Sequence, residues 1–134
     1  AKGITVSGLS GWLAESLTVV NNFDAVYIVI IVSVFTVILS EFASNTATVY
    51  LVLPIILAMT KSIDAPPLLL LIPVVFSASY AFMLPVATPP NMVVFGTELI
   101  KSKSMIKAGI ILNIIGITLV TISIFTLGKW VFGF

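Results

Sequence analysis

Residues 81–91 read AFMLPVATPPN and lie within residues 65–97, a stretch that contains no charged residue. A continuous α-helix cannot pass through this segment, because its three prolines remove backbone donors and clash with preceding carbonyls. The Pro66–Pro67 pair suits a helix start, where a missing N–H costs little, and we expect that helix to run to about Leu84. A short second helix over residues 92–100 is expected after the break.

The composition of the 134-residue chain is typical of a membrane protein. Apolar residues make up 60% and charged residues 8%, against roughly 45–50% and 25% in soluble domains. Too few charges are present to cover a soluble core, and lipid offers backbone amides no partners outside helices. We therefore expect an all-α integral membrane protein in the lipid bilayer.

The charged and reactive side chains exclude other classes of function. A net charge of +1 is too small to attract nucleic acid. The sequence contains no Cys, His or Arg, which removes thiolate metal sites, the usual general base and the usual bidentate anion clamp. No enzyme activity is expected.

A second polar interruption, SEFASNT at residues 40–46, separates two apolar arms. The arms, residues 24–39 and 47–60, give helices of about 24 and 21 Å at about 1.5 Å per residue, whereas a bilayer core is about 30 Å thick. Two short arms around a polar tip predict a re-entrant hairpin over residues 23–62. Two ordinary spans joined by an apolar loop remain the alternative.

The other segments complete a single domain, residues 1–134. Residues 1–22 are expected to form a weakly amphipathic interfacial arm, residues 66–100 the broken helix, and residues 105–132 a last transmembrane helix. The positive-inside rule places the cluster Lys101, Lys103 and Lys107 in the cytoplasm, which puts the C-terminus and both ends of the hairpin outside a plasma (inner) membrane.

Two breaks at membrane depth, each followed by a new helix, predict a binding site. Asn45 or Thr46 can N-cap the second hairpin arm, and Thr88 can N-cap the helix after the prolines. Helix starts present free N–H groups and the positive dipole end, which favour an anion. The carbonyls before each start suit a small cation such as Na⁺, and paired discontinuous helices are the usual plan of a secondary transporter. These carbonyls belong to residues around Ser40, Ala43 and Ala87.

Each of these features also has a purely structural reading. Residues 44–46 are also suitable caps of a tight turn, and Thr88 with its two following prolines is also a common helix kink. Glu41 is an ionisable group in a membrane segment and so a functional candidate. It can equally lock the hairpin through a hydrogen bond.

Residues 41–48, EFASNTAT, together with residues 81–91 strongly resemble the C-terminal repeat of the divalent anion:sodium symporters. That family carries dicarboxylates such as succinate, malate or fumarate, citrate, or sulfate. The resemblance covers nearly the whole chain and is sharpest at residues 40–54 and 76–96. It implies one half of an inverted-repeat, elevator-type transporter.

The resemblance also implies roles for individual residues. Ser44, Asn45 and Thr46 match the family's Ser-Asn-Thr signature and by resemblance bind a substrate carboxylate, with Thr88 and Pro89 approaching from the broken helix. The family's second sodium site, formed largely by main-chain oxygens, maps to Ser40, Ala43, Asn45 and Ala87. Position 40 holds Ser where the family has Thr at least as often, so the main-chain role is the firmer one there.

The chain departs from the family in length, because family members are several-fold longer and carry two Ser-Asn-Thr hairpins. We therefore expect the C-terminal part of a transporter, as a fragment or as one piece of a split protein, that lacks the N-terminal repeat and forms a homodimer when full length. The expected function is sodium-coupled transport of a divalent anion. The alternatives are an exchanger or proton-coupled carrier of the same fold and a non-transporting membrane assembly subunit.

Overall fold

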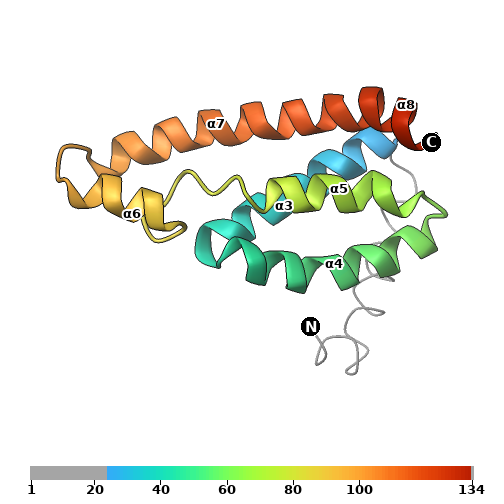
Figure 1. Ribbon diagram of the computed structural model, residues 1–134, viewed down its shortest axis with the longest axis horizontal. Helices are drawn as coiled ribbons and strands as arrows, with labels where there is room; N and C mark the ends of the chain where they lie inside the picture. Colours follow the sequence, from blue (N-terminus) through green and yellow to red (C-terminus); the bar gives the residue numbers. More distant parts are fainter. Residues whose placement is uncertain (1–23, 134) are drawn as a thin grey trace.

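The computed structural model describes residues 24–133, which form helices and no β-strand in that range (Figure 1). The helices are joined by turns and by one segment without regular structure, residues 80–84, which is called the extended segment below. The prediction of an all-α chain is confirmed there, and the predicted interfacial arm, residues 1–22, lies outside the described residues. The elements in chain order are α3 (Ala25–Phe42), α4 (Asn45–Ser62), α5 (Pro67–Ser77), α6 (Pro89–Gly96), α7 (Ser102–Ser123), the π-helical turn η2 (Ile124–Gly128) and α8 (Lys129–Phe132).

Helices α3 and α4 form a hairpin whose turn consists of Ala43 and Ser44. Both turn residues have extended backbone angles, and the Ser44 hydroxyl accepts the N–H of Ala47 at 3.2 Å. Ser44 is therefore the N-cap of α4, and the prediction that Asn45 or Thr46 caps this helix is wrong. Ser44 is the last residue outside the helical geometry, and the capping side chain belongs to that position.

Helix α5 packs against both arms of the hairpin and lies between them in the view of Figure 1. The apolar core forms where the three helices meet, and Ile124 of η2 closes it from the side of α7. Among its buried members are Val29 and Val32 of α3, Val52, Ile56 and Met59 of α4, and Leu70 and Val74 of α5.

The broken helix is interrupted earlier than the sequence predicts. Helix α5 ends at Ser77 instead of near Leu84, and α6 runs from Pro89 to Gly96 instead of over residues 92–100. Pro85 alone would stop a helix close to Leu84, because its ring clashes with the carbonyl four residues before it. The earlier end has a second cause, since side chains from other elements bond the backbone of residues 81–84 in an extended form.

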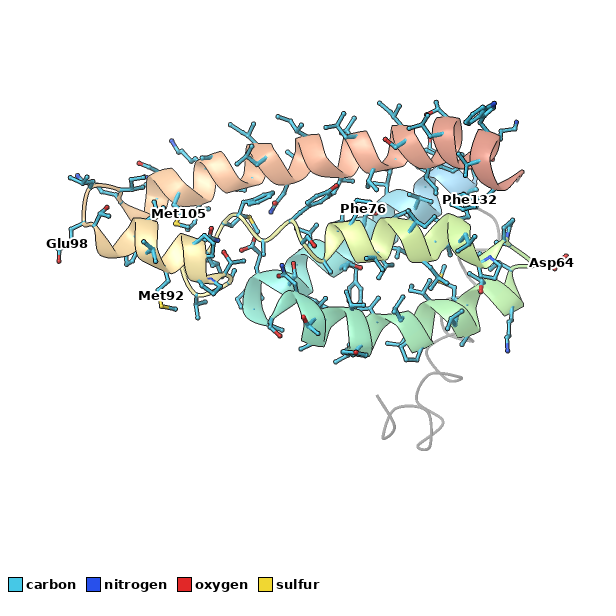
Figure 2. All side chains as sticks on the ribbon, viewed as in Figure 1. Asp64, Phe76, Met92, Glu98, Met105 and Phe132 are labelled. Atoms are coloured by element: carbon cyan, nitrogen blue, oxygen red, sulfur yellow. The ribbon has the colours of Figure 1, made fainter. Side chains whose placement is uncertain are left out.

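The last three elements make one helical rod from Ser102 to Phe132, of 31 residues, or about 46 Å. Its first residue precedes the predicted start by three positions. By length and composition, this rod and α3 can each cross a membrane. Figure 2 shows side chains along the outer side of α7. The helix exposes large apolar residues such as Ile111, Ile114 and Ile122.

The hairpin is shorter than this rod, because each 18-residue arm measures about 27 Å. Its open end lies beside the C-terminal end of the rod, and its tip lies next to the break between α5 and α6 (Figure 1). Asp64, after the hairpin, and Glu98, before the rod, mark opposite ends of the structure (Figure 2).

Two glycines bring α7 against the extended segment of the broken helix. A Cβ atom at Gly109 would lie 2.5 Å from the Phe82 carbonyl oxygen, and one at Gly116 would lie 2.9 Å from the ring of Tyr80. Only a residue without a side chain permits this separation at Gly109, because the opposing atoms belong to backbone. The unwound segment therefore rests directly on the α7 backbone.

Candidate functional site

The tip of the hairpin and the break in the second helix line one open groove of about 550 Å³. The sequence predicts that these two interruptions form a site, and the structure brings them together. Of the predicted site residues, Ala43, Ser44, Ala87 and Pro89 line the groove, together with Phe42, Val86, Met92 and Val93. The other predicted residues, Ser40, Asn45, Thr46 and Thr88, are their near neighbours in sequence and are not among the lining residues.

The N-terminal ends of α4 and α6 both lie at this groove, and each has a hydroxyl cap. Ser44 caps α4, and the Thr88 hydroxyl accepts the N–H of Asn91 at 3.4 Å, which confirms the predicted cap of α6. Two positive dipole ends at one groove favour an anion there.

The two helix starts differ in the donors that they offer. In α6, Pro89 and Pro90 have no N–H, the N–H of Asn91 bonds the Thr88 hydroxyl, and that of Met92 bonds the Thr88 carbonyl at 3.1 Å. The expectation that both starts present free N–H groups is therefore wrong for α6, which contributes its dipole and a hydroxyl. The first turn of α4 contains no proline and begins with the N–H groups of residues 45 and 46.

The residues predicted to hold a cation lie at three different kinds of position. Ser40 is completely buried, and its hydroxyl donates to the Val37 carbonyl at 3.0 Å. Ala43 ends α3. Ala87 was expected beside a helix C-terminus, but it lies in a turn and donates its N–H to the Leu84 carbonyl at 3.2 Å, because α5 ends at Ser77.

One buried acceptor at the site has no donor. The Asn45 side-chain oxygen is buried and has no hydrogen-bond partner in the described part of the chain. Leaving such an atom unpaired costs about 1–3 kcal/mol, and an amide oxygen is a suitable ligand for a hard cation. This oxygen at the hairpin tip is therefore a suitable ligand for a small cation.

Two side chains satisfy the backbone of the extended segment. The Glu41 carboxylate is completely buried and accepts the N–H of Met83 at 2.9 and 3.1 Å and that of Leu84 at 2.9 Å. The Asn91 amide donates to the carbonyls of Ala81 and Leu84 at 2.7 and 3.0 Å. Non-helical backbone in a membrane protein needs such internal partners. Glu41 does form hydrogen bonds, but they join the hairpin to the segment between α5 and α6 instead of closing the hairpin on itself.

Asn113 of α7 is a third contributor, which was not among the residues predicted from the sequence. It is buried and donates from its amide to Glu41 Oε1 at 3.1 Å. The sequence held a signal for it, because a polar residue in a long neutral helix is costly in lipid. Asn113 also shares a helix face with Gly109 and Gly116, which lie four residues before it and three after it.

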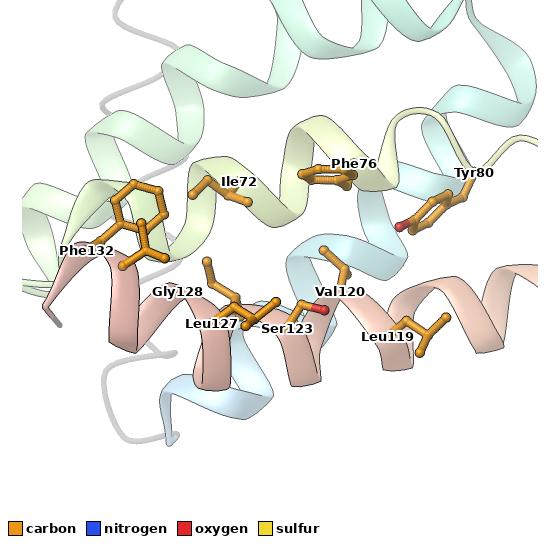
Figure 3. A pocket seen from close by; sticks show the side chains of 11 residues that line it. Ile72, Phe76, Tyr80, Leu119, Val120, Ser123, Leu127, Gly128 and Phe132 are labelled. Carbon is orange, nitrogen blue, oxygen red and sulfur yellow. The ribbon is translucent and has the colours of Figure 1, made fainter.

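Another hollow, of about 340 Å³, lies between α5 and the C-terminal rod (Figure 3). Ile72 and Phe76 form one wall, and Leu119, Val120 and Leu127 contribute to the other. Its lining is mostly apolar apart from the hydroxyls of Tyr80 and Ser123. The groove at the hairpin tip differs in that α4 and α6 begin there, and two helix N-termini favour an anion.

Comparisons with known proteins place the chain in a family. The family model described as the sodium:sulfate symporter transmembrane region matches residues 1–134. The chain is 39% identical over 133 residues to the sodium-dependent dicarboxylate transporter SdcS of Staphylococcus saprophyticus, covering 99% of this chain and 26% of that protein. It is 44% identical over 132 residues to the Na(+)/citrate cotransporter of Rattus norvegicus, covering 98% of this chain and 23% of that protein.

The Na(+)/dicarboxylate cotransporter 3 of Rattus norvegicus is 37% identical over 132 residues, with 98% of this chain and 22% of that protein covered. The chain thus spans about a quarter of the length of the curated relatives that it matches. The family match extends over every residue of the chain and so includes the residues of both walls of the groove. The chain therefore belongs to the sodium:sulfate symporter family, the divalent anion:sodium symporters.

Proposed function

We propose that this chain forms the C-terminal part of a sodium-coupled transporter of divalent anions. The observation that carries the proposal is the groove in which the starts of two helices and the end of a third meet. The relatives named as sodium-dependent dicarboxylate and Na(+)/citrate transporters support the same function. The partner of this half-site is the N-terminal repeat of an inverted-repeat, elevator-type carrier that forms a homodimer.

The anion half-site consists of the hairpin tip and the start of α6. Ser44, Asn45 and Thr46 bind one carboxylate through hydroxyl groups and the N–H groups of the first turn of α4. Thr88 and Pro89 face it from α6, whose contribution is the helix dipole rather than N–H donors. Dicarboxylates such as succinate, malate or fumarate are the expected substrates, with citrate and sulfate as further candidates.

The cation half-site lies on the other side of the tip. Asn45 is shared by both half-sites, and its unpaired side-chain oxygen is the strongest support for a sodium ligand there. Ser40 contributes main-chain oxygen, because its hydroxyl already donates within α3. Ala43 and Ala87 complete the set through main-chain oxygens on the two walls of the groove.

The arrangement in the membrane follows from the lengths and charges of the elements. The hairpin is proposed to be re-entrant because each 18-residue arm, at about 27 Å, is slightly shorter than a bilayer core of about 30 Å, and because its polar tip lies at the groove. The end of the structure that carries Glu98 faces the cytoplasm of a plasma (inner) membrane, because it also carries the positive cluster of Lys101, Lys103 and Lys107. The hairpin then opens from the outside, where the C-terminus also lies.

Uptake by proteoliposomes tests the proposed function. A full-length transporter that contains this segment is reconstituted, and uptake of labelled succinate, citrate and sulfate is measured with an inward gradient of Na⁺, K⁺ or protons. Uptake that requires the Na⁺ gradient is expected. Uptake driven by protons, or only by preloaded anion, would identify the carrier or exchanger alternative. An assembly subunit would show neither uptake nor anion-dependent thermal stabilisation.

A further inference from the structure

The Glu41 carboxylate joins the two walls of the proposed anion groove without facing the groove. It precedes Phe42, which lines the wall formed by the hairpin, and it binds the backbone of Met83 and Leu84, which lead into Val86 on the opposite wall. Its side chain has no exposed surface. It therefore acts on a ligand only through the residues that it holds.

Both carboxylate oxygens are engaged, which fixes the orientation of the group. Oε1 accepts from the N–H of Met83 at 2.9 Å and from the Asn113 amide at 3.1 Å. Oε2 accepts from Met83 at 3.1 Å and from Leu84 at 2.9 Å. Hydrogen bonds to a charged group are the stronger kind, and these four contacts tie three separate elements at one point.

Asn113 attaches this point to the longest helix of the structure. Its short side chain reaches Glu41 because Gly109 and Gly116, on the same face, let the α7 backbone approach the extended segment. Its side-chain oxygen is buried and has no hydrogen-bond partner in the described range. In this structure, therefore, the bond to Glu41 is the polar contact that orients the amide.

We propose that Glu41 and Asn113 are a pair of positioning residues that sets the spacing between the hairpin tip and the start of α6. The pair fixes the shape of the groove for anion and sodium alike, although neither side chain lines the groove. The proposal rests on the proposed function where transport is measured. The distance between the hairpin and α6 can be measured whether or not that function is correct.

Substitutions at Glu41 separate the length of the side chain from its charge. Glu41→Asp keeps the charge but is one methylene shorter, so it cannot reach the Met83 backbone and Asn113 together. Glu41→Gln keeps the length, its oxygen accepts the backbone N–H groups, and Asn113 can turn its unpaired oxygen toward the new amide. A positioning role therefore predicts that Glu41→Asp is the more damaging variant.

Substitutions on α7 test the partner. Asn113→Leu removes the donor at similar volume and leaves the bonds between Glu41 and the backbone in place. Thr121→Val is the matched control, because Thr121 is also buried on α7 but its hydroxyl donates only to the Ile117 carbonyl of its own helix.

The experiment measures uptake kinetics and one distance in a full-length transporter that contains this segment, in a background without other cysteines. Spin labels are placed at Tyr50→Cys on α4 and Gly96→Cys on α6, which are exposed positions. Glu41→Asp and Asn113→Leu should raise KM for anion and for sodium by about tenfold or more, change Vmax less, and broaden the distance distribution. Glu41→Gln and Thr121→Val should stay closer to the parent in both readouts.

Two results would overturn the proposal. One is a Glu41→Gln variant that is more damaging than Glu41→Asp, which would show that the charge itself is the essential property. The other is a distance distribution that stays as narrow as that of the parent in Asn113→Leu. If one Glu41 variant fails to fold, Asn113→Leu against Thr121→Val still decides the question. If the transporter carries no anion, the distance readout still decides it.

Discussion

Replacing Gly109 by Ala should disturb the binding groove from the far side of the extended segment. The new Cβ would lie 2.5 Å from the Phe82 carbonyl oxygen and 2.6 Å from Met83 Cα. Ordinary contact between such atoms needs about 3.5 Å, so α7 and the segment must separate by about 1 Å. The opposing atoms are backbone and cannot turn aside as a side chain can.

The cost of this separation follows from what holds the segment in place. Inserting a methyl group into a packed interior costs about 1–3 kcal/mol. The N–H of Met83 is held by Glu41 at 2.9 Å, so displacement of the segment also stretches a bond to a charged group, worth about 1.5–3 kcal/mol. We expect Gly109→Ala to lower the free energy of unfolding by an amount in the upper part of the range of about 1–3 kcal/mol, or by more. The variant should also bind the anion more weakly.

Two further glycines serve as graded controls for this prediction. At Gly116 the Cβ would meet the Tyr80 ring at 2.9 Å. A side chain can shift where backbone cannot, so a cost near the lower end of the range, about 1 kcal/mol, is expected. At Gly96 nothing lies within 4 Å, and Ala should be neutral or stabilising by less than about 1 kcal/mol.

The assay is the thermal unfolding of the three purified variants in detergent, with and without anion and Na⁺. The expected order of destabilisation is Gly109→Ala, then Gly116→Ala, then Gly96→Ala. A Gly109→Ala variant with the stability and the anion affinity of the parent would refute the close packing of α7 against the extended segment.

Three other predictions follow from the site and the fold. Asn45→Ala should weaken anion and sodium binding together by roughly tenfold to a hundredfold, measured by isothermal titration, with the exposed Thr118→Val as control; loss of only one affinity would contradict the shared role. Asp64→Cys should react with an impermeant thiol reagent on intact cells and Ser102→Cys only after permeabilisation, whereas the reverse pattern would invert the proposed orientation. Pro85→Ala should leave the distance between labels at Tyr50 and Gly96 unchanged, because Glu41 and Asn91 hold the break; a change would show that the proline alone maintains it.

The sequence predicted the interruptions better than the ends of the helices around them. Prolines and polar residues are local signals, so the hairpin tip and the break at residues 85–91 were recognisable from composition alone. The end of α5 at Ser77 was not, because it depends on Glu41, a residue 42 positions away from Met83. A local pattern contains no information on such a contact.

The candidate site shows the same division. The helix starts at the groove and the Thr88 cap of α6 were predicted from residue types, whereas the cap of α4 was placed at Asn45 or Thr46 instead of Ser44. The number of free N–H groups at α6 was overestimated, although Pro89 and Pro90 have no backbone N–H and could have been discounted from the sequence. The contact of Asn113 with Glu41 spans 72 positions and required the structure.

The bonds of Glu41 also constrain the order in which this chain can be assembled in a membrane. Ribosomes add about 5–20 residues per second, so the backbone N–H of Met83, 42 positions later, follows Glu41 by about 2–8 s. Asn113, 72 positions later, follows by about 4–14 s on the same estimate. Until Met83 is made, the carboxylate has none of its final donors, and it lacks one of them until Asn113 is made. A charge without partners is costly in lipid. The hairpin is therefore synthesised before the broken helix and the long rod, but its tip can settle at its final depth only after both have been made.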